Sequence, residues 1–387
     1  MSKNKLPFDT TLLILVSILV VFGIVMVYSA SSFKAQQATG DSHHYLENHL
    51  IKVGLSFLIM LVAMQIDYRF WLKISPYLLL LSLLALLILF TPLVEAIRGS
   101  RRWIVFGALR FQPSDFARIA LILFLSQWLG KLDLRKKGSE NVFLKTLAVI
   151  GVIVVPVMLQ PDIGTAGLMV VIALTLIFLA GERLRHLLFL GMASIPVFIL
   201  ILKHNEYQRN RLLQYVSSIK GEEISWQIQQ SLIALGNGSF FGIGLGSGRQ
   251  KYHFLPDPYT DFIYSIVGEE LGIIGTLGIL ILFLLLIWRG FNIAMQAPGR
   301  QARLLAIGIV LNIAVYLIAN AGVVTNLLPT TGIPMPLISY GGSAMMATLF
   351  AMGVLLNISS QIKQSRSFHP VNNAYRRGGH FKRYGSS

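Results

Sequence analysis

The chain has 387 residues, of which 54% are hydrophobic and only 13% are charged. Soluble globular proteins carry about 25% charged residues, so the composition excludes a soluble domain and is typical of an integral membrane protein. There is no cysteine, which excludes disulfide bonds and thiol chemistry. The formal net charge is +16, and the placement of these cations argues for a membrane surface rather than a nucleic-acid partner.

Apolar runs of roughly 17–25 residues recur along the chain, each long enough to cross about 30 Å of hydrocarbon as a helix. The runs are uninterrupted, which favours helices over a β-barrel. The first run has no small-residue cleavage site behind it and is interpreted as a retained span. We predict an all-α membrane protein with ten spans, at 10–29, 48–66, 76–92, 113–130, 143–159, 164–181, 186–202, 262–288, 303–326 and 341–358.

The basic residues predict the orientation. An even number of spans places both termini on one side, and the segments on that side carry 20 of the 33 Lys and Arg residues. Because cytoplasmic segments are enriched in Lys and Arg, both termini are expected in the cytoplasm. The predicted organisation is a membrane domain over 1–360 with one large extracytoplasmic loop at about 203–261. A basic cytoplasmic tail, 361–387, follows as a partly disordered anchor near anionic headgroups.

The predicted outer loop 93–112 is short, yet it holds four arginines against the expected charge bias. Its sequence GSRRWIVFGALRFQPS alternates and predicts a small hairpin. A basic, aromatic outer surface suits an anionic group such as a pyrophosphate, which makes Arg101 and Arg102 candidate substrate-binding residues. The alternative is ordinary anchoring at the membrane interface. The four arginines are Arg98, Arg101, Arg102 and Arg110.

Two charged residues follow in FQPSDFARIAL, 111–121. Pro113 suits the first position of a helix, and Asp115 and Arg118 are three residues apart, so they share one helix face. They lie at the outer end of a membrane helix, where a lone charge is costly. Either the two form a self-contained pair that closes the helix end, or Arg118 also reaches an acid from elsewhere.

Asp162 lies in LQPDIGTAG, 159–167, where two apolar runs meet with almost no room for a loop. Pro161 and Gly164 break the helix there. Irregular backbone at this depth is tolerated where it lines a cavity or packs inside the protein. Asp162 is therefore a candidate cavity residue, and N-capping of the next helix by Asp162 or Thr165 is the equal alternative.

The large outer loop contains an amphipathic stretch, SWQIQQSLIALG, that could lie on the membrane surface. The glycine-rich run GNGSFFGIGLGSG follows it. It lacks the Lys-Ser/Thr ending and the preceding strand of a P-loop, so we interpret it as a hinge over a cavity. No His/Cys cluster has zinc-site spacing.

The stretch RQKYHFLPDPYTDFIYSIVGEELG, 249–272, leads from this loop into a long apolar helix. Asp261 lies where the polar loop ends and the span begins. An ionisable group at such a boundary is a functional candidate because burying a charge is costly. Lys251 is a candidate anion-binding residue in the same stretch. Glu269 and Glu270 are as well explained by packing or by the positive end of the helix dipole.

The last outer segment is NLLPTTGIPMPLISYGGS, 326–343. Three prolines and three glycines keep it non-helical at the membrane boundary. It carries hydroxyl groups, including that of Ser339, and no charged residue. It is therefore expected to be a cavity wall, with Ser339 as a substrate-binding candidate, and the alternative is a structural re-entrant turn.

Four segments together resemble the SEDS family (shape, elongation, division and sporulation): QPSDFAR, QPDIGTA, the run from GLGSGRQK to GEELG, and LPTTGIPMPLISYGGS. The likeness covers about 10–360, in the same order. It implies ten transmembrane helices and a peptidoglycan glycosyltransferase that polymerises lipid II with a class B penicillin-binding protein. The essential acid of the family falls on Asp261. The motifs are closer to the division or sporulation branch than to the elongation branch.

Two departures from the family pattern concern the predicted site. Residues 113–118 read PSDFAR, where the family usually has Pro-Ser-Glu-Phe-Ala-Lys. The negative and the positive charge are kept, but the side chains that carry them differ in length. The loop before Asp261 reads PDPYTD, where the family often has Pro-Glu followed by His, and that His is absent.

Lipid II polymerisation requires a base for the attacking sugar hydroxyl and cations for the departing lipid diphosphate. Asp261 is the predicted base, and Arg118 is expected within ion-pairing distance of it. Arg101, Arg102, Lys251 and a divalent cation, Mg²⁺ or Mn²⁺, are the predicted diphosphate ligands. A single attack inverts the anomeric centre. A retaining scheme needs a second acid, for which Asp115 is the only candidate.

Two other functions remain open at this stage: a lipid II flippase and a non-catalytic scaffold for division or elongation proteins. Transporters also show ionisable residues and broken helices in the membrane. A flippase would use acids near the bilayer midplane, whereas the charges here gather at the predicted outer face. That distribution favours chemistry in the outer leaflet of the bacterial cytoplasmic membrane.

Overall fold

The computed structural model describes residues 8–92, 94, 100–106, 109–132, 140–252 and 254–367. This part of the chain is almost entirely helical, with one short two-stranded hairpin. The elements in chain order are α1 Thr10–Thr39, α2 His44–Gln65, α3 Tyr68–Ile88, β1 Ile104–Phe106, β2 Leu109–Phe111, α4 Pro113–Lys131, α5 Glu140–Leu159, α6 Ile163–Leu179, α7 Leu184–His204, α8 Glu206–Ile219, α9 Trp226–Gly238, α10 Ile263–Gln296, α11 Gly299–Val324 and α12 Gly342–Ser367.

Each of the ten predicted spans overlaps one of the helices α1–α7 and α10–α12. Seven of these helices are long and apolar enough to cross a membrane: α1, α2, α3, α5, α10, α11 and α12. The other three helices are α4, α6 and α7. α4 carries the charged residues Asp115 and Arg118, and α6 has only 17 residues, which is short for a membrane span. The chain is thus a multi-pass helical membrane protein, while the number ten remains a prediction.

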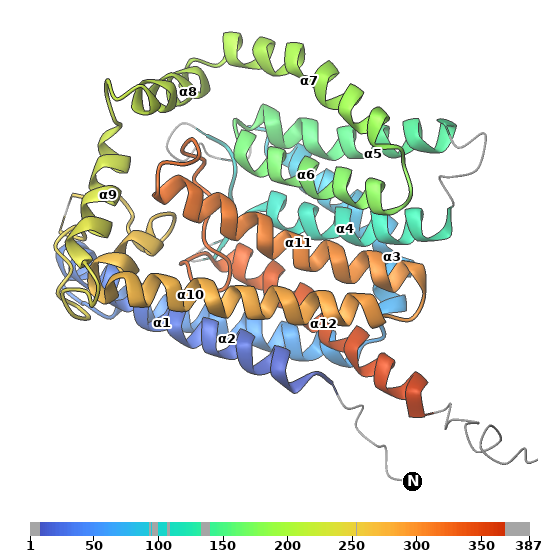
Figure 1. Ribbon diagram of the computed structural model, residues 1–387, viewed down its shortest axis with the longest axis horizontal. Helices are drawn as coiled ribbons and strands as arrows, with labels where there is room; N and C mark the ends of the chain where they lie inside the picture. The colour runs from blue at the N-terminus through green and yellow to red at the C-terminus, as the bar shows by residue number, and fades with distance from the viewer. Residues whose placement is uncertain are drawn as a thin grey trace, which may run out of the picture.

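The long helices lie side by side in one bundle (Figure 1). α8 and α9 lie at one end of the bundle, and the start of α1 and the last turn of α12 lie at the other. The hairpin predicted from alternation is confirmed, with Ile104 opposite Phe111 and Phe106 opposite Leu109. The tail prediction lies largely outside the described residues, since α12 continues to Ser367 and the chain beyond it is not described.

The centre of the bundle is built on α11 and α12, which are the most buried of the apolar helices. Close helix contact depends on small residues there, as is typical of membrane helix packing. A Cβ atom at Gly353 of α12 would lie 2.4 Å from the carbonyl oxygen of Met60 on α2. This glycine therefore lets the two helix backbones approach directly.

Helix α10 is interrupted at Gly272, whose φ of 66° and ψ of −161° are not helical. The glycine-rich segment after α9 docks against this break: Ile273 donates its N–H to the Ser239 carbonyl at 2.9 Å, and Ile243 donates to the Glu269 carbonyl at 3.0 Å. A Cβ atom at Gly272 would lie 2.4 Å from the backbone nitrogen of Gly242. The segment predicted to be a hinge is thus held in place by backbone hydrogen bonds.

Candidate active site

Asp261 lies two residues before α10 and is half-buried. Its backbone carbonyl accepts a hydrogen bond from Asn320 Nδ2 on α11 at 2.7 Å, and the same amide donates to the Ile333 carbonyl at 2.8 Å. The hydroxyl of Ser339 donates to the carbonyl of Thr260 at 2.6 Å. Helix α11 and the non-helical segment after it therefore fix the backbone that carries the predicted base.

Arg211 on α8 binds the non-helical segment that passes Asp261. Its Nη1 donates to the carbonyl of Thr330 at 3.2 Å. Two residues on, a Cβ atom at Gly332 would lie 3.4 Å from Asp261 Oδ2, so this segment passes close to the carboxylate. Burial lowers the pKa of Arg211, and the carboxylates of Asp261 and Asp162 counteract that effect by favouring the charged guanidinium. Arg211 thus interacts electrostatically with both acids.

The turn at Asp162 adjoins this group. Asp162 caps α6 by accepting from the Thr165 N–H, as one of the two interpretations predicted, and its Oδ2 accepts from Gln112 Nε2 at 3.3 Å. Arg102 donates from Nε to the Gln160 carbonyl at 3.0 Å and from Nη2 to the next carbonyl along the chain. Arg102 therefore braces the turn and also adds to the positive field around Arg211.

The other arginines of the hairpin loop are less closely associated with Asp261. Arg101 is exposed and donates from Nη1 to the carbonyl of Thr91 at 3.3 Å. Its contact with a diphosphate remains a prediction. Arg98 lies outside the described residues.

Asp115 and Arg118 form the buried pair that their spacing on α4 predicts. Arg118 Nη2 lies 3.7 Å from Asp115 Oδ1, and Ser343 donates to Asp115 Oδ2 at 2.8 Å. The Arg118 guanidinium lies 3.9 Å from the ring centre of Tyr316. The predicted ion pair between Arg118 and Asp261 is not formed, because the acid facing Arg118 is its own helix neighbour.

Unsatisfied polar atoms surround this pair. Among the described residues, Arg118 Nε and Nη1, Asn312 Oδ1 and the Tyr316 hydroxyl are buried without a hydrogen-bond partner. Arg118, Asn312, Tyr316 and Ser339 line a cavity of about 10 Å³, which is room for about one water molecule. A water there would connect the buried arginine to the segment that holds the backbone of Asp261.

Lys251 does not occupy the position predicted for a diphosphate ligand. Its ammonium group is buried and donates to Glu270 Oε1 at 2.7 Å, to the Gly246 carbonyl at 2.7 Å and to Ser29 Oγ at 3.2 Å. These three acceptors use all of its protons. Glu270 and Glu269, both fully buried, also accept backbone N–H groups from the segment 246–250. The two acids are thus structural: they hold the last part of the large loop against α10.

Ser339 also differs from its prediction as a substrate ligand. Its oxygen donates to the Thr260 carbonyl and accepts from the Met335 N–H at 2.8 Å, and the residue is 3% exposed. The prediction that 326–343 forms a non-helical wall is confirmed for the stretch after α11, which has no helix before Gly342. Ser339 ties that wall to the Asp261 segment and acts by positioning it.

The structure offers no preformed metal centre in the part of the chain that it describes, where no three acidic or histidine side chains gather closely enough to bind an ion. The predicted divalent cation therefore remains a prediction.

Sequence reasoning missed two residues of this site. No sequence signal singles out Arg211: it lies on α8, three residues after Gln208, whose Nε2 donates to the Pro161 carbonyl at 2.7 Å. Asn320 does carry a sequence signal, because membrane helices bury few polar side chains without a partner, and an amide inside α11 is therefore expected to have one.

Comparison with known proteins identifies the family of the chain. Residues 9–364 match the family model FTSW_RODA_SPOVE, described as cell cycle protein. The chain is 39% identical over 358 residues to the probable peptidoglycan glycosyltransferase FtsW of Geobacter sulfurreducens, covering 92% of this chain and 96% of the relative. It is also 39% identical over 361 residues to stage V sporulation protein E of Bacillus subtilis, covering 93% and 99%.

Solved structures show the same fold. A chain of a peptidoglycan synthase complex, studied for its coordination of polymerization and crosslinking, superposes with a TM-score of 0.75 at 26% identity, covering 93% of this chain and all of that one. The rod shape determining protein RodA of Thermus thermophilus gives a TM-score of 0.67 at 27% identity, covering 91% and 97%. The match of a family model over nearly the whole membrane region, together with relatives of this identity, shows that the chain belongs to the FtsW/RodA/SpoVE family of SEDS proteins.

Proposed function

We propose that the chain is a peptidoglycan glycosyltransferase that polymerises lipid II into glycan strands at the outer face of the bacterial cytoplasmic membrane during cell division. Relatives named as probable peptidoglycan glycosyltransferases support this activity. The observation that carries this proposal is the placement of Asp261, a half-buried residue just before a helix. Its backbone is fixed by α11, and its carboxylate interacts electrostatically with Arg211. A base beside a cation is the combination that glycosyl transfer from a diphosphate requires.

In the proposed reaction, Asp261 takes the proton of a sugar 4-hydroxyl while that oxygen attacks the anomeric carbon of a second lipid-linked disaccharide. The bond from the anomeric carbon to the diphosphate oxygen breaks, and its electron pair leaves with undecaprenyl diphosphate. The protonated Asp261 then releases its proton to solvent. One displacement of this kind inverts the anomeric centre from α to β. The buried pairing of Asp115 with Arg118 and Ser343 argues against Asp115 as a second, nucleophilic carboxylate.

The diphosphate is expected to contact Arg211 and Arg102, which surround the turn at Asp162 next to Asp261. Arginine suits this role because its planar guanidinium group can donate two parallel hydrogen bonds to the oxygens of a phosphate. If the reaction uses Mg²⁺ or Mn²⁺, we expect the substrate diphosphates to supply most of the ligands, since the described acids do not form a three-residue site.

Arg211→Gln is expected to lower the rate of glycan synthesis by about 100-fold, because it removes a positioned cation from the developing diphosphate charge. Arg209→Gln is the matched control: Arg209 lies on the same helix, is exposed and pairs only weakly, at 3.8 Å, with Glu206. The measurement is polymer formed from lipid II at equal amounts of folded protein. Equal losses in the two variants would show that general surface charge, not Arg211, matters.

The proposed topology has ten spans, both termini in the cytoplasm, and the hairpin and α8–α9 outside. Cysteines at Glu222, in the α8–α9 connection, and at Arg185, at the start of α7, are both at exposed positions in a chain without natural cysteine. In intact spheroplasts, a membrane-impermeant maleimide should label the first and spare the second. Labelling of both would contradict the ten-span arrangement.

The proposed partner is a class B penicillin-binding protein, together with other division or elongation proteins. The similarity to a chain of a peptidoglycan synthase complex supports a transpeptidase partner. Purified chain mixed with its cognate transpeptidase should convert lipid II into glycan polymer, which is the direct test of the proposed function. Absence of polymer with the folded complex would favour the flippase or scaffold instead.

A further inference from the structure

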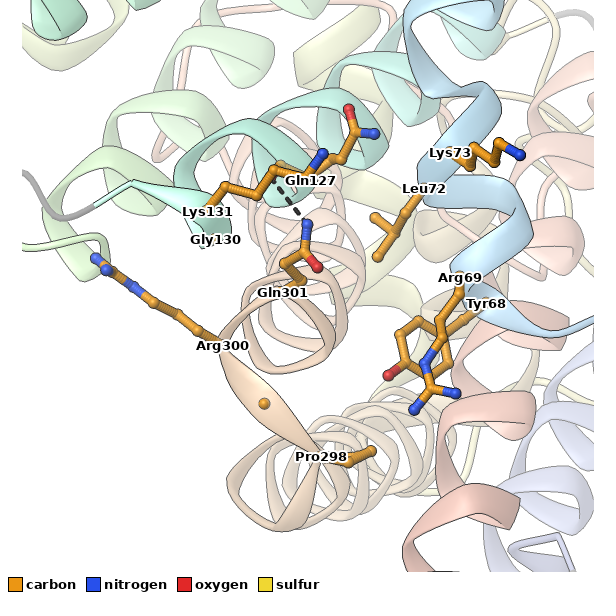
Figure 2. Close-up of a pocket in the computed structure, with 11 residues that line it drawn as sticks. Tyr68, Arg69, Leu72, Lys73, Gln127, Gly130, Lys131, Pro298, Arg300 and Gln301 are labelled. Atoms are coloured by element: carbon orange, nitrogen blue, oxygen red, sulfur yellow. Dashed lines mark hydrogen bonds between the residues drawn. The ribbon is translucent and has the colours of Figure 1, made fainter.

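A recess of about 360 Å³ lies at the end of the bundle opposite Asp261. Asp261 precedes the first residue of α10, whereas the recess includes Pro298, just after the last residue of that helix. Figure 2 shows the lining residues, which come from the first turns of α3, the last turns of α4 and the start of α11. They are Tyr68, Arg69, Leu72, Lys73, Gln127, Gly130, Lys131, Pro298, Gly299, Arg300 and Gln301.

The lining is strongly basic and none of these eleven residues is acidic. Lys73 and Lys131 are exposed, and neither forms a hydrogen bond or an ion pair with another described residue. Arg69 has one distant ion pair, 3.9 Å from Asp67, in which both side chains are exposed. Such exposed pairs contribute little, so among the described residues the positive charge of the recess is largely uncompensated. We name Arg69, Lys73 and Lys131 the basic rim.

Arg300 is not part of the basic rim. Figure 2 shows its side chain extending away from the other labelled residues, and its guanidinium donates to the carbonyls of Leu132 and Ala180. It ties the start of α11 to the ends of α4 and α6. Arg300 therefore stabilises the helix ends that form the recess, while the basic rim remains available to bind a ligand.

Neutral groups in the recess also suit an oxyanion. Helix α11 begins at Gly299 after Pro298, and no side chain caps its first N–H groups. These donors and the positive end of the helix dipole favour a phosphate. Gln301 donates from Nε2 to the backbone carbonyl of Gln127 at 3.1 Å, so the Gln301 side chain is held at the recess (Figure 2). Together with the three cations of the basic rim, these groups have the chemistry that suits a phosphate group.

The surface next to the recess is apolar. Leu72 forms a buried part of its lining, and along α3 the side chains of Phe70, Tyr77, Leu80 and Leu81 are exposed. A phosphate bound at the helix ends would place attached acyl chains along this face of α3. A free phosphate would make no use of it. The adjacent apolar surface therefore favours a lipid over a soluble anion.

We propose that this recess binds the phosphodiester headgroup of one anionic phospholipid from the membrane leaflet that faces the cytoplasm. Basic pockets between membrane helices on that side bind acidic lipid headgroups in general. The leaflet follows from the proposed topology, but the site itself does not depend on the activity of Asp261. The bound lipid bridges α3, α4 and α11. Because α4 carries Arg118 and α11 carries Asn320, the lipid stabilises the two helices that support the candidate active site.

The test uses the purified full-length chain in a neutral detergent. Native mass spectrometry and thermal unfolding are recorded while phosphatidylglycerol, phosphatidylcholine or inorganic phosphate is added. The wild-type protein should retain one phosphatidylglycerol more tightly than further copies and should unfold at a higher temperature with it, because a ligand of the native state stabilises that state. Phosphatidylcholine and inorganic phosphate should have much weaker effects.

The decisive variant is Arg69→Gln/Lys73→Gln/Lys131→Gln, which should bind phosphatidylglycerol roughly tenfold to a hundredfold more weakly. Lys145→Gln/Arg183→Gln/Arg185→Gln removes the same charge from three exposed positions outside the recess and should bind normally. Unchanged binding by the first variant, or equal losses in both, would overturn the proposal. Equal stabilisation by phosphatidylcholine, or full stabilisation by inorganic phosphate alone, would overturn the assignment to an anionic lipid.

Discussion

Asp261→Asn is expected to fold and insert normally but to make glycan roughly 10²–10⁴-fold more slowly, because it removes the base while keeping the size of the side chain. The contacts from Asn320 to the Asp261 carbonyl and from Ser339 to the Thr260 carbonyl involve backbone atoms, so they survive the substitution. The measurement is polymer formed from lipid II by the purified variant with its transpeptidase, normalised to folded protein by thermal unfolding.

Two further variants sharpen this experiment. Asp261→Glu should retain more activity, since a carboxylate survives with a different reach. Glu223→Gln removes an exposed acid from the same outer loop and should leave the rate unchanged. Asp257, although closer, is an unsuitable control because its Oδ1 pairs with Lys34 Nζ at 2.5 Å. Near wild-type polymerisation by folded Asp261→Asn would end the assignment of Asp261 as the base.

The same experiment separates the proposed functions. A flippase would give no polymer in any variant, and the substitution would change only lipid translocation. A scaffold would give no polymer and would retain partner binding in every variant. A glycosyltransferase gives polymer with wild type and Glu223→Gln and loses it with Asp261→Asn. Polymer formation therefore separates the glycosyltransferase from the other two functions, and a change in lipid translocation separates the flippase from the scaffold.

The fold was largely predictable because its signals are local. The length of the apolar runs identifies each long helix, and the alternation of 99–114 identifies the hairpin. The break in α10 was not predictable, because the conformation of Gly272 depends on the segment after α9, which exchanges backbone hydrogen bonds with the helix on both sides of the break. Such a contact joins segments whose pairing no periodicity reveals.

The candidate site was only partly predictable for a related reason. Spacing on a helix shows that Asp115 and Arg118 share a face, but it does not show which acid lies opposite Arg118. The structure shows that Asp115 itself is that acid. The roles of Ser339 and Asn320 depend on backbone carbonyls of the Asp261 segment. Every residue has a backbone carbonyl, so the identity of the accepting residue does not reveal these contacts.

Lys251 gives the sharpest contrast between sequence and structure, and Lys251→Met tests it. The sequence predicts a diphosphate ligand, whereas the structure shows a buried partner of Glu270 with a side chain only 2% exposed. Methionine keeps the packing of the stem and leaves the Glu270 carboxylate without its counter-ion. Breaking a buried ion pair from one side costs about 3–5 kcal/mol. We therefore expect a clearly lower unfolding temperature and less folded protein, with Lys220→Met, at an exposed loop position, as the unaffected control.

The double variant Lys251→Met/Glu270→Gln tests whether the stability lost in Lys251→Met comes from the unpaired charge of Glu270. It removes both charges, so it should recover part of the stability lost in the single variant. Full recovery is not expected, because Glu270 also accepts hydrogen bonds from Ser29 Oγ at 2.7 Å and from the Gly246 N–H at 3.0 Å, which position the segment before Asp261. The opposite result would be a Lys251→Met protein of normal stability that needs more lipid II to reach the same rate. That protein would restore Lys251 as the diphosphate ligand that the sequence predicts.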